Sequence, residues 1–319
     1  MALLVQPTPL AAAVEKFSAR TPVGSVLRSA EWADMPLALR ERAFFSAGVE
    51  HAQLLQGMKD RLAQSLQMAR DPETGAFMGK ERFIIEARRI AAEAGLGTQG
   101  QGDWRNLKDI SSVARLGLIY DMNTRQATGY ARRKTDLSAG ALDAAPAYEF
   151  VRLTPRRVPR ADWTDRFREA CEEAGDERAL AVLNQTGRMM ALKTSDVWEK
   201  LSRFDVPWAP FDYGSGMGLR SVPRAQAEAV SLIDPDEPVE PGDTEERFNA
   251  KVEASAEGLD LETRQALQTA FGPQIDIEGD RVRWQDDASS YDAIGAMSEA
   301  GAAIRDMIRS VFKRRKAAA

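Results

Sequence analysis

The chain has a single cysteine, Cys171, and a single histidine, His51, among its 319 residues. One cysteine cannot form a disulfide within the chain, and with one histidine it cannot complete a zinc site of the usual Cys/His kind. The fold must therefore be held together by an apolar core, for which a hydrophobic content of 44% is sufficient.

Both residues are expected to be structural rather than catalytic. His51 lies in a polar stretch with helical periodicity, which favours a surface or partly packed histidine. Cys171 is surrounded by glutamates in Arg-Glu-Ala-Cys-Glu-Glu-Ala, and nearby carboxylates disfavour the thiolate that a nucleophile needs. Without a second histidine, most catalytic schemes that depend on histidine are excluded unless His51 serves.

The charge balance limits the class of partner. A formal net charge of −5 excludes a protein that is basic overall, so nucleic-acid binding is open only to local basic segments. No stretch approaches the roughly 18 apolar residues of a transmembrane helix. Prolines interrupt the apolar run at the N-terminus, so we expect neither a signal peptide nor a membrane partner.

Apolar periodicity predicts a helical N-terminal part. We interpret residues 1–36 as an arm and residues 37–102 as a helical region. Within that region, apolar residues recur every three or four positions over residues 37–69 and again over 80–94, which predicts two helices. The Gly- and Gln-rich stretch 95–102 is the expected domain boundary.

A mixed domain is expected over residues 103–233. Helical patterns alternate there with short strand-like runs, and Asn106 is placed to cap the first helix. The predicted elements are strands at 148–153 and 189–192 and helices at 106–134, 163–173, 196–204 and 223–232.

The last part of the chain begins with an acidic, proline-rich segment, residues 234–247. This segment is predicted to be a linker because its composition cannot bury a core. Residues 248–319 are expected to form a small region with a β-hairpin around Glu278-Gly279-Asp280 and a C-terminal helix with a basic end. The expected fold class is α+β and predominantly helical, with a helical N-terminal region, a central mixed α/β domain and a small C-terminal α+β region.

Two basic segments are candidate binding sites. The basic run at the C-terminus would contact phosphates without sequence preference, and a solvated helix end is an equally open interpretation. Its candidate nucleic-acid-binding residues are Arg309, Lys313, Arg314, Arg315 and Lys316. The second segment, residues 152–160, is rich in Arg and Pro, and its prolines fix an extended backbone that suits a docking strand or a loop. The residues expected to dock a protein partner, there and in the aromatic loop that follows later, are Arg156, Arg157, Phe211, Tyr213 and Met217.

The glycines of Gly214-Ser-Gly-Met-Gly218 superficially match a phosphate-binding loop, but their context differs. Two prolines precede them where a dinucleotide site needs a buried strand, and the P-loop Gly-Lys-Ser/Thr is missing. We therefore expect a tight loop with glycines at positive φ and docked aromatic side chains. No catalytic, cofactor-binding or metal-binding residue can be assigned. A nucleotide- or phosphate-using enzyme built around this loop stays as an alternative.

Several segments of the middle region form a pattern when taken in order. The first contains Met122-Asn-Thr-Arg125, followed by Gly129-Tyr130. The later ones include Tyr148-Glu-Phe-Val-Arg152 and Pro210-Phe-Asp-Tyr-Gly-Ser-Gly-Met-Gly218. The full set of blocks is residues 118–132, 148–152, 188–193, 198–204, 210–218 and 222–229. Together they resemble the phage Mu F-like minor head proteins, a family of head-morphogenesis proteins, over about residues 105–233.

This resemblance implies a structural minor capsid protein of a tailed phage or prophage. It implies a position near the portal vertex of the virion head, assembled in the host bacterial cytoplasm, with roles in head assembly and in DNA packaging or ejection. The implied partners are the portal protein, the major capsid or scaffolding protein, and packaged DNA. The implied protein is not an enzyme and has no cofactor. Many members carry a His/Cys cluster where this chain has Phe211-Asp-Tyr-Gly214, so no metal site is carried over. A non-virion DNA-associated protein that acts through the basic tail is the other alternative.

Overall fold

The computed structural model describes residues 10–24, 29–33, 37–68, 78–97, 103–241, 253–255, 268, 275–279 and 281–284. Its elements give a mixed α+β fold that is mainly helical, which confirms the expected fold class. The chain divides into two compact units. The first unit contains the described residues from Glu15 to Asp121 and those after Thr244. The second contains Leu10–Val14 and the described residues from Met122 to Pro241.

The first unit begins with the second half of a helix, which buries an aromatic residue. Phe17 is fully buried, and its ring meets that of Phe44 edge-on at 6.0 Å. Phe17, in the segment interpreted as an arm, is therefore packed in the core of this unit, whereas Leu10–Val14 are grouped with the second unit. The helices and strands up to residue 93 are α1 (Ala11–Ser18), β1 (Thr21–Val23), α2 (Ser29–Ala33), α3 (Leu37–Arg42), β2 (Ala43–Phe45), α4 (Ala52–Leu66) and α5 (Lys80–Glu93).

The single helix predicted over residues 37–69 is broken by a strand. Ala43–Phe45 pairs in parallel with Thr21–Val23, so pairing with a distant segment overrides the helical pattern. The chain then turns through Gly48 at a φ of 69°. His51 begins α4, because its Nδ1 accepts a hydrogen bond from the backbone N–H of Leu54 at 3.2 Å.

The boundary between the two units falls inside the long helix α6 (Val113–Asp136) rather than in the stretch 95–102. The first half of α6 packs within the first unit, where the Tyr120 ring lies 5.5 Å from that of Phe83 and Lys80 pairs with Asp121 at 2.5 Å. The helix also begins later than predicted. Ser112 caps it by accepting from the N–H of Arg115 at 3.1 Å, whereas Asn106 accepts from Lys108 in a preceding turn.

A three-stranded antiparallel sheet is the centre of the second unit. The strand order is β4 (Met190–Leu192), β3 (Ala147–Arg152) and β5 (Met217–Val222), with β3 in the middle. Tyr148 and Phe150 project from the same face of β3. The Tyr148 ring meets that of Trp198 edge-on, with 5.9 Å between the ring centroids. The Phe150 ring meets those of Trp163 and Phe211 edge-on, at 5.0 and 5.1 Å.

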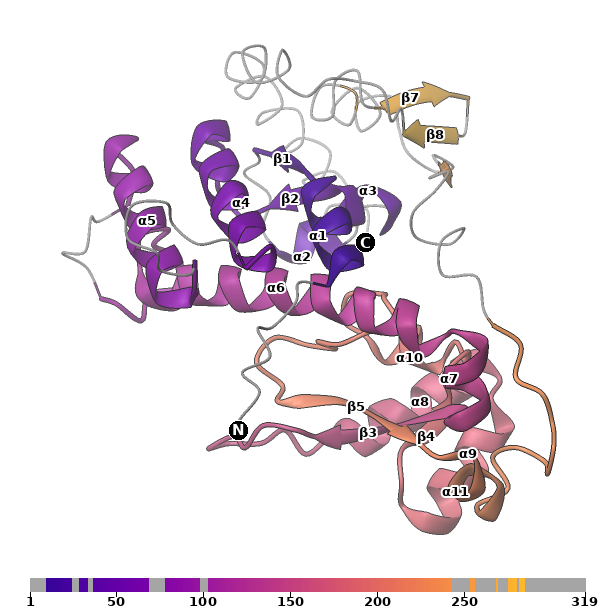
Figure 1. Cartoon of the computed structure of the whole chain (residues 1–319). Coiled ribbons are helices and arrows are strands. Elements are labelled where there is room, and N and C mark those ends of the chain that lie inside the picture. The colour runs from indigo at the N-terminus through magenta and orange to yellow at the C-terminus, as the bar shows by residue number, and fades with distance from the viewer. Residues whose placement is uncertain are drawn as a thin grey trace, which may run out of the picture. The chain divides into compact units, whose positions relative to one another are not determined.

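Short helices surround this sheet (Figure 1). They are α7 (Ala139–Ala144), α8 (Trp163–Ala174), α9 (Glu177–Thr186), α10 (Val197–Leu201) and α11 (Arg224–Ala229). Strands β3 and β4 and helix α8 confirm the sequence prediction. Strand β5 and helices α7 and α9 were not predicted. Helices α10 and α11 are shorter than the patterns at 196–204 and 223–232 indicated.

The described part of the predicted acidic linker, residues 234–241, is tied to the second unit. Arg178 of α9 pairs with Asp234 at 3.0 Å and with Glu237 at 2.7 Å. Arg224 donates to the backbone carbonyl of Glu237, and Val239 packs against the apolar core. The prediction of a linker is therefore wrong for these residues, because two arginines and one valine give the segment specific contacts.

The predicted C-terminal hairpin is confirmed. Strands β7 (Ile275–Glu278) and β8 (Arg281–Trp284) pair antiparallel, and Gly279 has a φ of 56° in the turn. A further strand, β6 (Glu253–Ser255), pairs with the other edge of β8. The predicted C-terminal helix and the basic run at 309–316 lie outside the described residues.

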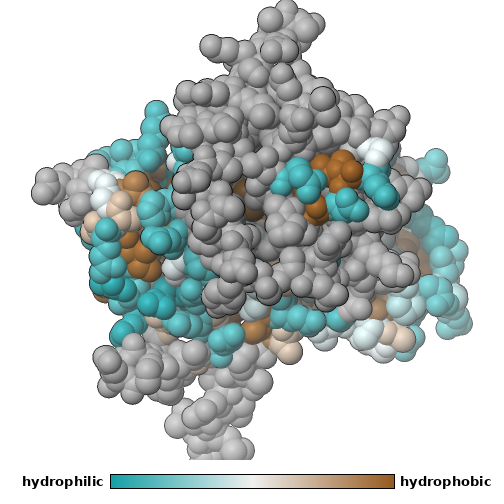
Figure 2. All heavy atoms as spheres, turned by 90° about the horizontal axis from the view of Figure 1, so that it is seen from above, coloured by the Kyte–Doolittle hydropathy of each residue, from teal (hydrophilic) through white to brown (hydrophobic). Residues whose placement is uncertain are grey.

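Exposed apolar side chains are few in the described part of the chain. On the face drawn in Figure 2, hydrophobic groups are small and bordered by hydrophilic side chains. Among all described residues, Val158 is the most exposed large hydrophobic residue, at 81%, and Leu153 is 60% exposed. Of the helices that the structure describes, none combines the length and the apolarity that a bilayer crossing requires.

Candidate functional site

Two loops meet at one end of the sheet in the second unit. One follows β3, and the other precedes β5 (Figure 1). They are neighbours because these strands are antiparallel, with Arg152 opposite Met217. The backbone N–H groups of Leu153 and Thr154 both donate to the carbonyl of Gly216, at 2.9 and 3.0 Å. We call residues 152–160, which are the last residue of β3 and the first part of the loop after it, the arginine ridge.

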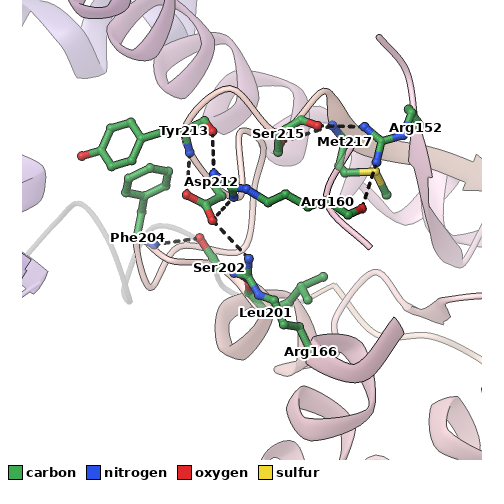
Figure 3. Close-up of polar contacts among 10 residues, drawn as sticks. All are labelled: Arg152, Arg160, Arg166, Leu201, Ser202, Phe204, Asp212, Tyr213, Ser215 and Met217. Carbon is green, nitrogen blue, oxygen red and sulfur yellow. Dashed lines mark hydrogen bonds and ion pairs between the residues drawn. The ribbon is translucent and has the colours of Figure 1, made fainter. Parts of the chain in front are cut away.

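Asp212 anchors the ridge. Its side chain is only 6% exposed and accepts hydrogen bonds from Arg160 of the ridge and, at 3.1 Å, from Arg166 of α8 (Figure 3). The other carboxylate oxygen accepts from the backbone N–H of Tyr213 at 2.7 Å. Because two guanidinium groups and one amide already occupy this carboxylate, its role is to hold the two loops together.

Other arginines add backbone contacts around the same point. Arg152 donates to the carbonyls of Ser215 at 3.0 Å and Arg160 at 3.5 Å, and Arg160 donates to that of Tyr213 at 3.1 Å. Arg166 donates to the carbonyl of Leu201 and lies 4.1 Å from the centre of the Trp163 ring. These contacts cross-link the ridge, α8 and the loop before β5 into one rigid arrangement.

Arg156 and Arg157 are placed differently from the other ridge arginines. Both are exposed, and neither forms a hydrogen bond or ion pair within the part of the chain that the structure describes. Arg156 packs over Gly216, where an added Cβ would lie 3.0 Å from the Arg156 Nε and 2.5 Å from the Thr154 carbonyl oxygen. The ridge thus presents two guanidinium groups to solvent beside the exposed Val158.

The predicted docking residues fall into three environments. Arg156 and Arg157 lie on the ridge. Tyr213 is 36% exposed, with its ring 5.0 Å from that of Phe204, and Met217 is half-buried in β5. Phe211, in contrast, is fully buried in the aromatic core, so its expected role in docking is wrong. Its burial agrees instead with the expectation that aromatic side chains of this loop pack on the domain.

The most exposed apolar side chains of the site, those of Val158 and Leu153, were missed by sequence reasoning. The anchoring pair Arg160 and Asp212 was missed as well. Only the clustering of arginines and prolines signalled the segment, and no sequence pattern links residue 160 to residue 212.

A comparison with protein-family models, curated proteins and solved structures found no match to this chain. Function must therefore be argued from the chain's own residues and from the resemblance of its sequence blocks.

A second buried carboxylate lies on β3. Glu149 is 6% exposed and accepts two hydrogen bonds from Arg188, both 2.8 Å, and one from Arg220 at 2.5 Å. The hydrogen bonds from Arg188, followed by those from Arg220, lower the pKa of Glu149 to about 2 against the opposing effect of burial. A carboxylate held ionised in this way joins the start of β4 to β5 across β3.

The glycine loop at 214–218 leads directly into strand β5. A dinucleotide site instead needs a helix that opens on the glycines, so its backbone dipoles can face the phosphates. Gly214 and Gly216 have φ values of 58° and 72°, as expected for a tight turn. The neighbouring aromatics Phe211 and Tyr213 pack on the unit.

The structure also shows the environment of the single cysteine and the spacing of the side chains that could bind a metal. Cys171 is buried in α8, and burial together with Asp176 and Glu172 raises the pKa of its thiol to about 12. Among the residues that the structure describes, no three His, Cys, Asp or Glu side chains are grouped so as to hold a metal ion.

Proposed function

We propose that this chain is a structural minor head protein of a tailed phage or prophage, which acts by binding other head proteins near the portal vertex. The observation that carries the proposal is the order of the sequence blocks that resemble the Mu F-like family, taken with their positions in the fold. Those blocks supply nearly all of β3, the whole of β4, both ends of β5 and the loop that anchors the arginine ridge.

The packing of the helix block against the segment that precedes the block at 210–218 supports this proposal. Gly129 and Tyr130, in the helix block, face the loop that leads into the block at 210–218. A Cβ at Gly129 would lie 2.1 Å from the carbonyl oxygen of Ala209, and the Tyr130 ring is 5.3 Å from that of Trp208. Gln126 accepts from the Trp208 indole N–H at 2.8 Å. Gln126 also donates to the carbonyl of Pro210, inside that block, at 3.4 Å, so the helix block packs on the start of the block at 210–218.

The use of charged groups also supports a binding role. The buried carboxylates of Asp212 and Glu149 are each fixed by two arginines, whereas Arg156 and Arg157 face solvent on a rigid segment. A surface that is rigid before it meets its partner loses little conformational entropy on binding. In the proposal, the portal and the major capsid or scaffolding protein are the partners, and the basic run at 309–316 contacts packaged DNA.

The test is the protein content of purified phage particles after induction of the host that carries this gene. We expect the chain to copurify with portal and capsid proteins through a density gradient, in a few copies per head. Particles that are complete and infectious but contain none of it would overturn the proposal. Genes for terminase, portal and capsid on either side of this gene would provide independent support.

The enzyme alternative has its own measurement. A nucleotide that binds only the native state stabilises it by RT ln(1 + [L]/Kd). We expect ATP, GTP and NAD, each at millimolar concentration, to leave the Tm of the full chain unchanged. A rise in Tm that disappears in a variant of the glycine loop would favour the enzyme.

A further inference from the structure

We propose that the outer part of the arginine ridge docks a protein partner whose facing surface combines an apolar pocket with carboxylates. Val158 and Leu153 would enter the pocket, and Arg156 and Arg157 would pair with the carboxylates. This inference rests on the proposed function, because it adds the chemistry of the partner's surface to the binding role proposed there.

The ridge has a charge opposite to that of the chain as a whole. Residues 152–160 include four arginines and no acidic residue, in a protein with a net charge of −5. The carboxylate that anchors the ridge, that of Asp212, is already paired with Arg160 and Arg166. Asp212 therefore does not neutralise the guanidinium groups of Arg156 and Arg157. Acidic side chains on the partner would complement their charge.

The ridge is also held in a defined shape. Pro155 and Pro159 restrict the backbone on either side of Val158. The segment is fixed at its start by the hydrogen bonds to Gly216 and at its end by the contacts of Arg160 with Asp212 and Tyr213. A segment tied at both ends presents its middle residues without a large ordering cost on binding.

The apolar residues favour a protein over a nucleic acid as the partner. Val158 is 81% exposed and lies directly after the two arginines, where a phosphate backbone offers no apolar contact. Two guanidinium groups that bind DNA phosphates would also displace only about two counterions from the DNA, so binding to DNA through them would be weak. Protein interfaces, in contrast, combine arginine with apolar side chains that become buried at their centre.

The experiment places a photo-crosslinking amino acid, benzoylphenylalanine, at position 158 of the full-length chain. The chain is expressed from its own gene in host cells during particle assembly, and crosslinks are made both in cells and in purified particles. A matched chain carries the same amino acid at Arg125, an exposed position of α6 outside the ridge. Crosslinked peptides are mapped by mass spectrometry.

We expect position 158 to crosslink to one protein, at a site where apolar residues adjoin Asp or Glu. The double variant Arg156→Glu/Arg157→Glu should lower the yield of that crosslink by roughly tenfold or more, because like charges would then face each other. Exchange of the mapped acids for lysine in the partner should restore it. The control Arg125→Glu/Arg132→Glu, which reverses two exposed charges of the same unit, should leave the yield unchanged.

The outcomes separate this inference from the proposed function. If the chain is present in particles but position 158 crosslinks to DNA or to nothing, the inference is overturned and the structural role survives. If position 158 crosslinks to such an acidic site in cells while particles lack the chain, the inference stands and the head-protein role fails. Loss of the crosslink in the Arg125→Glu/Arg132→Glu control as well would also overturn the inference, because the effect would then be general.

Discussion

Arg166 of α8 and Asp212 of the loop before β5 form an ion pair of 3.1 Å between two segments that lie 46 residues apart in sequence. The same carboxylate oxygen also meets Arg160 of the ridge. A single buried acid thus connects a helix, a loop and the most exposed segment of the second unit.

We expect Asp212→Asn to destabilise the protein and to loosen the ridge. The amide keeps the shape of the side chain but leaves Arg160 and Arg166 without their countercharge. Both guanidinium groups are partly exposed, at 41% and 25%, so water screens part of the loss. The free energy of unfolding should fall by about 2 kcal/mol, less than for a fully buried pair.

Urea denaturation of the full chain measures this effect. Asp165→Asn is the control, because Asp165 is 75% exposed and its ion-pair partner among the described residues is Arg168 on its own helix. Its free energy of unfolding should change by at most about 0.5 kcal/mol. Equal effects of the two substitutions would contradict the anchoring role of Asp212.

Gly216→Ala should perturb the ridge more than Gly214→Ala does. Both glycines have a positive φ, 72° and 58°, so each substitution carries a strain of roughly 1 kcal/mol. Only at residue 216 would the new Cβ lie 2.5 Å from the Thr154 carbonyl oxygen, whereas nothing lies within 4 Å at residue 214. The difference in unfolding free energy between the two variants isolates the steric contribution. We expect Gly216→Ala to be less stable by a further 1 to 3 kcal/mol or so, and equal stabilities would argue against this close approach.

Much of the second unit could be predicted from local pattern, and the parts that failed have physical causes. Strand β3 was found because three strand-forming residues, Tyr148, Phe150 and Val151, follow closely after a proline. Strand β5 was missed because it lies at the edge of the sheet, where Arg220 and Ser221 face solvent and Gly218 interrupts the apolar pattern. Helix α9 did carry its signals: Asp176 caps it, and Gly187 ends it at a φ of 70°.

The candidate site was predictable only in part. The ridge could be recognised because proline and arginine are concentrated in this short segment of the sequence. The pairing of Arg160 with Asp212 left none, since it depends on antiparallel strands that bring residues 152 and 217 together. The burial of Phe211 also follows from tertiary packing against Phe150 and Trp198. Periodicity describes one segment at a time, so contacts between segments are beyond it.

Cys171 should resist alkylation in the native protein. Its side chain is buried in α8, and its raised thiol pKa, about 12, leaves very little thiolate at pH 8. We expect iodoacetamide to modify less than about a tenth of the native protein under conditions that modify the urea-unfolded chain completely. Intact mass spectrometry measures both. Rapid labelling of the native chain would show that α8 opens readily or that the thiol is activated.

Glu149 should make stability depend on pH in acid. The pKa of Glu149 is lowered from 4.5 to about 2 in the folded chain, chiefly by hydrogen bonds from Arg188. A group whose folded pKa is depressed stabilises the native state above its unfolded pKa, and this contribution is lost as pH falls through the folded value. The loss therefore begins near pH 4.5 and is complete near pH 2.

The substitution Glu149→Gln removes this ionisation. Because Arg220 is 60% exposed and screened by water, we expect a loss of about 1 to 2 kcal/mol at pH 7 that shrinks towards zero near pH 2. Arg188→Gln should have a larger effect than Arg220→Gln, since Arg188 donates two hydrogen bonds and is only 29% exposed. Urea denaturation at pH 7, 4.5 and 3 measures all three variants against the unmodified chain. If Glu149→Gln lowers stability equally at every pH, the effect comes from packing, and the ionised carboxylate is not what joins β3 to its neighbouring strands.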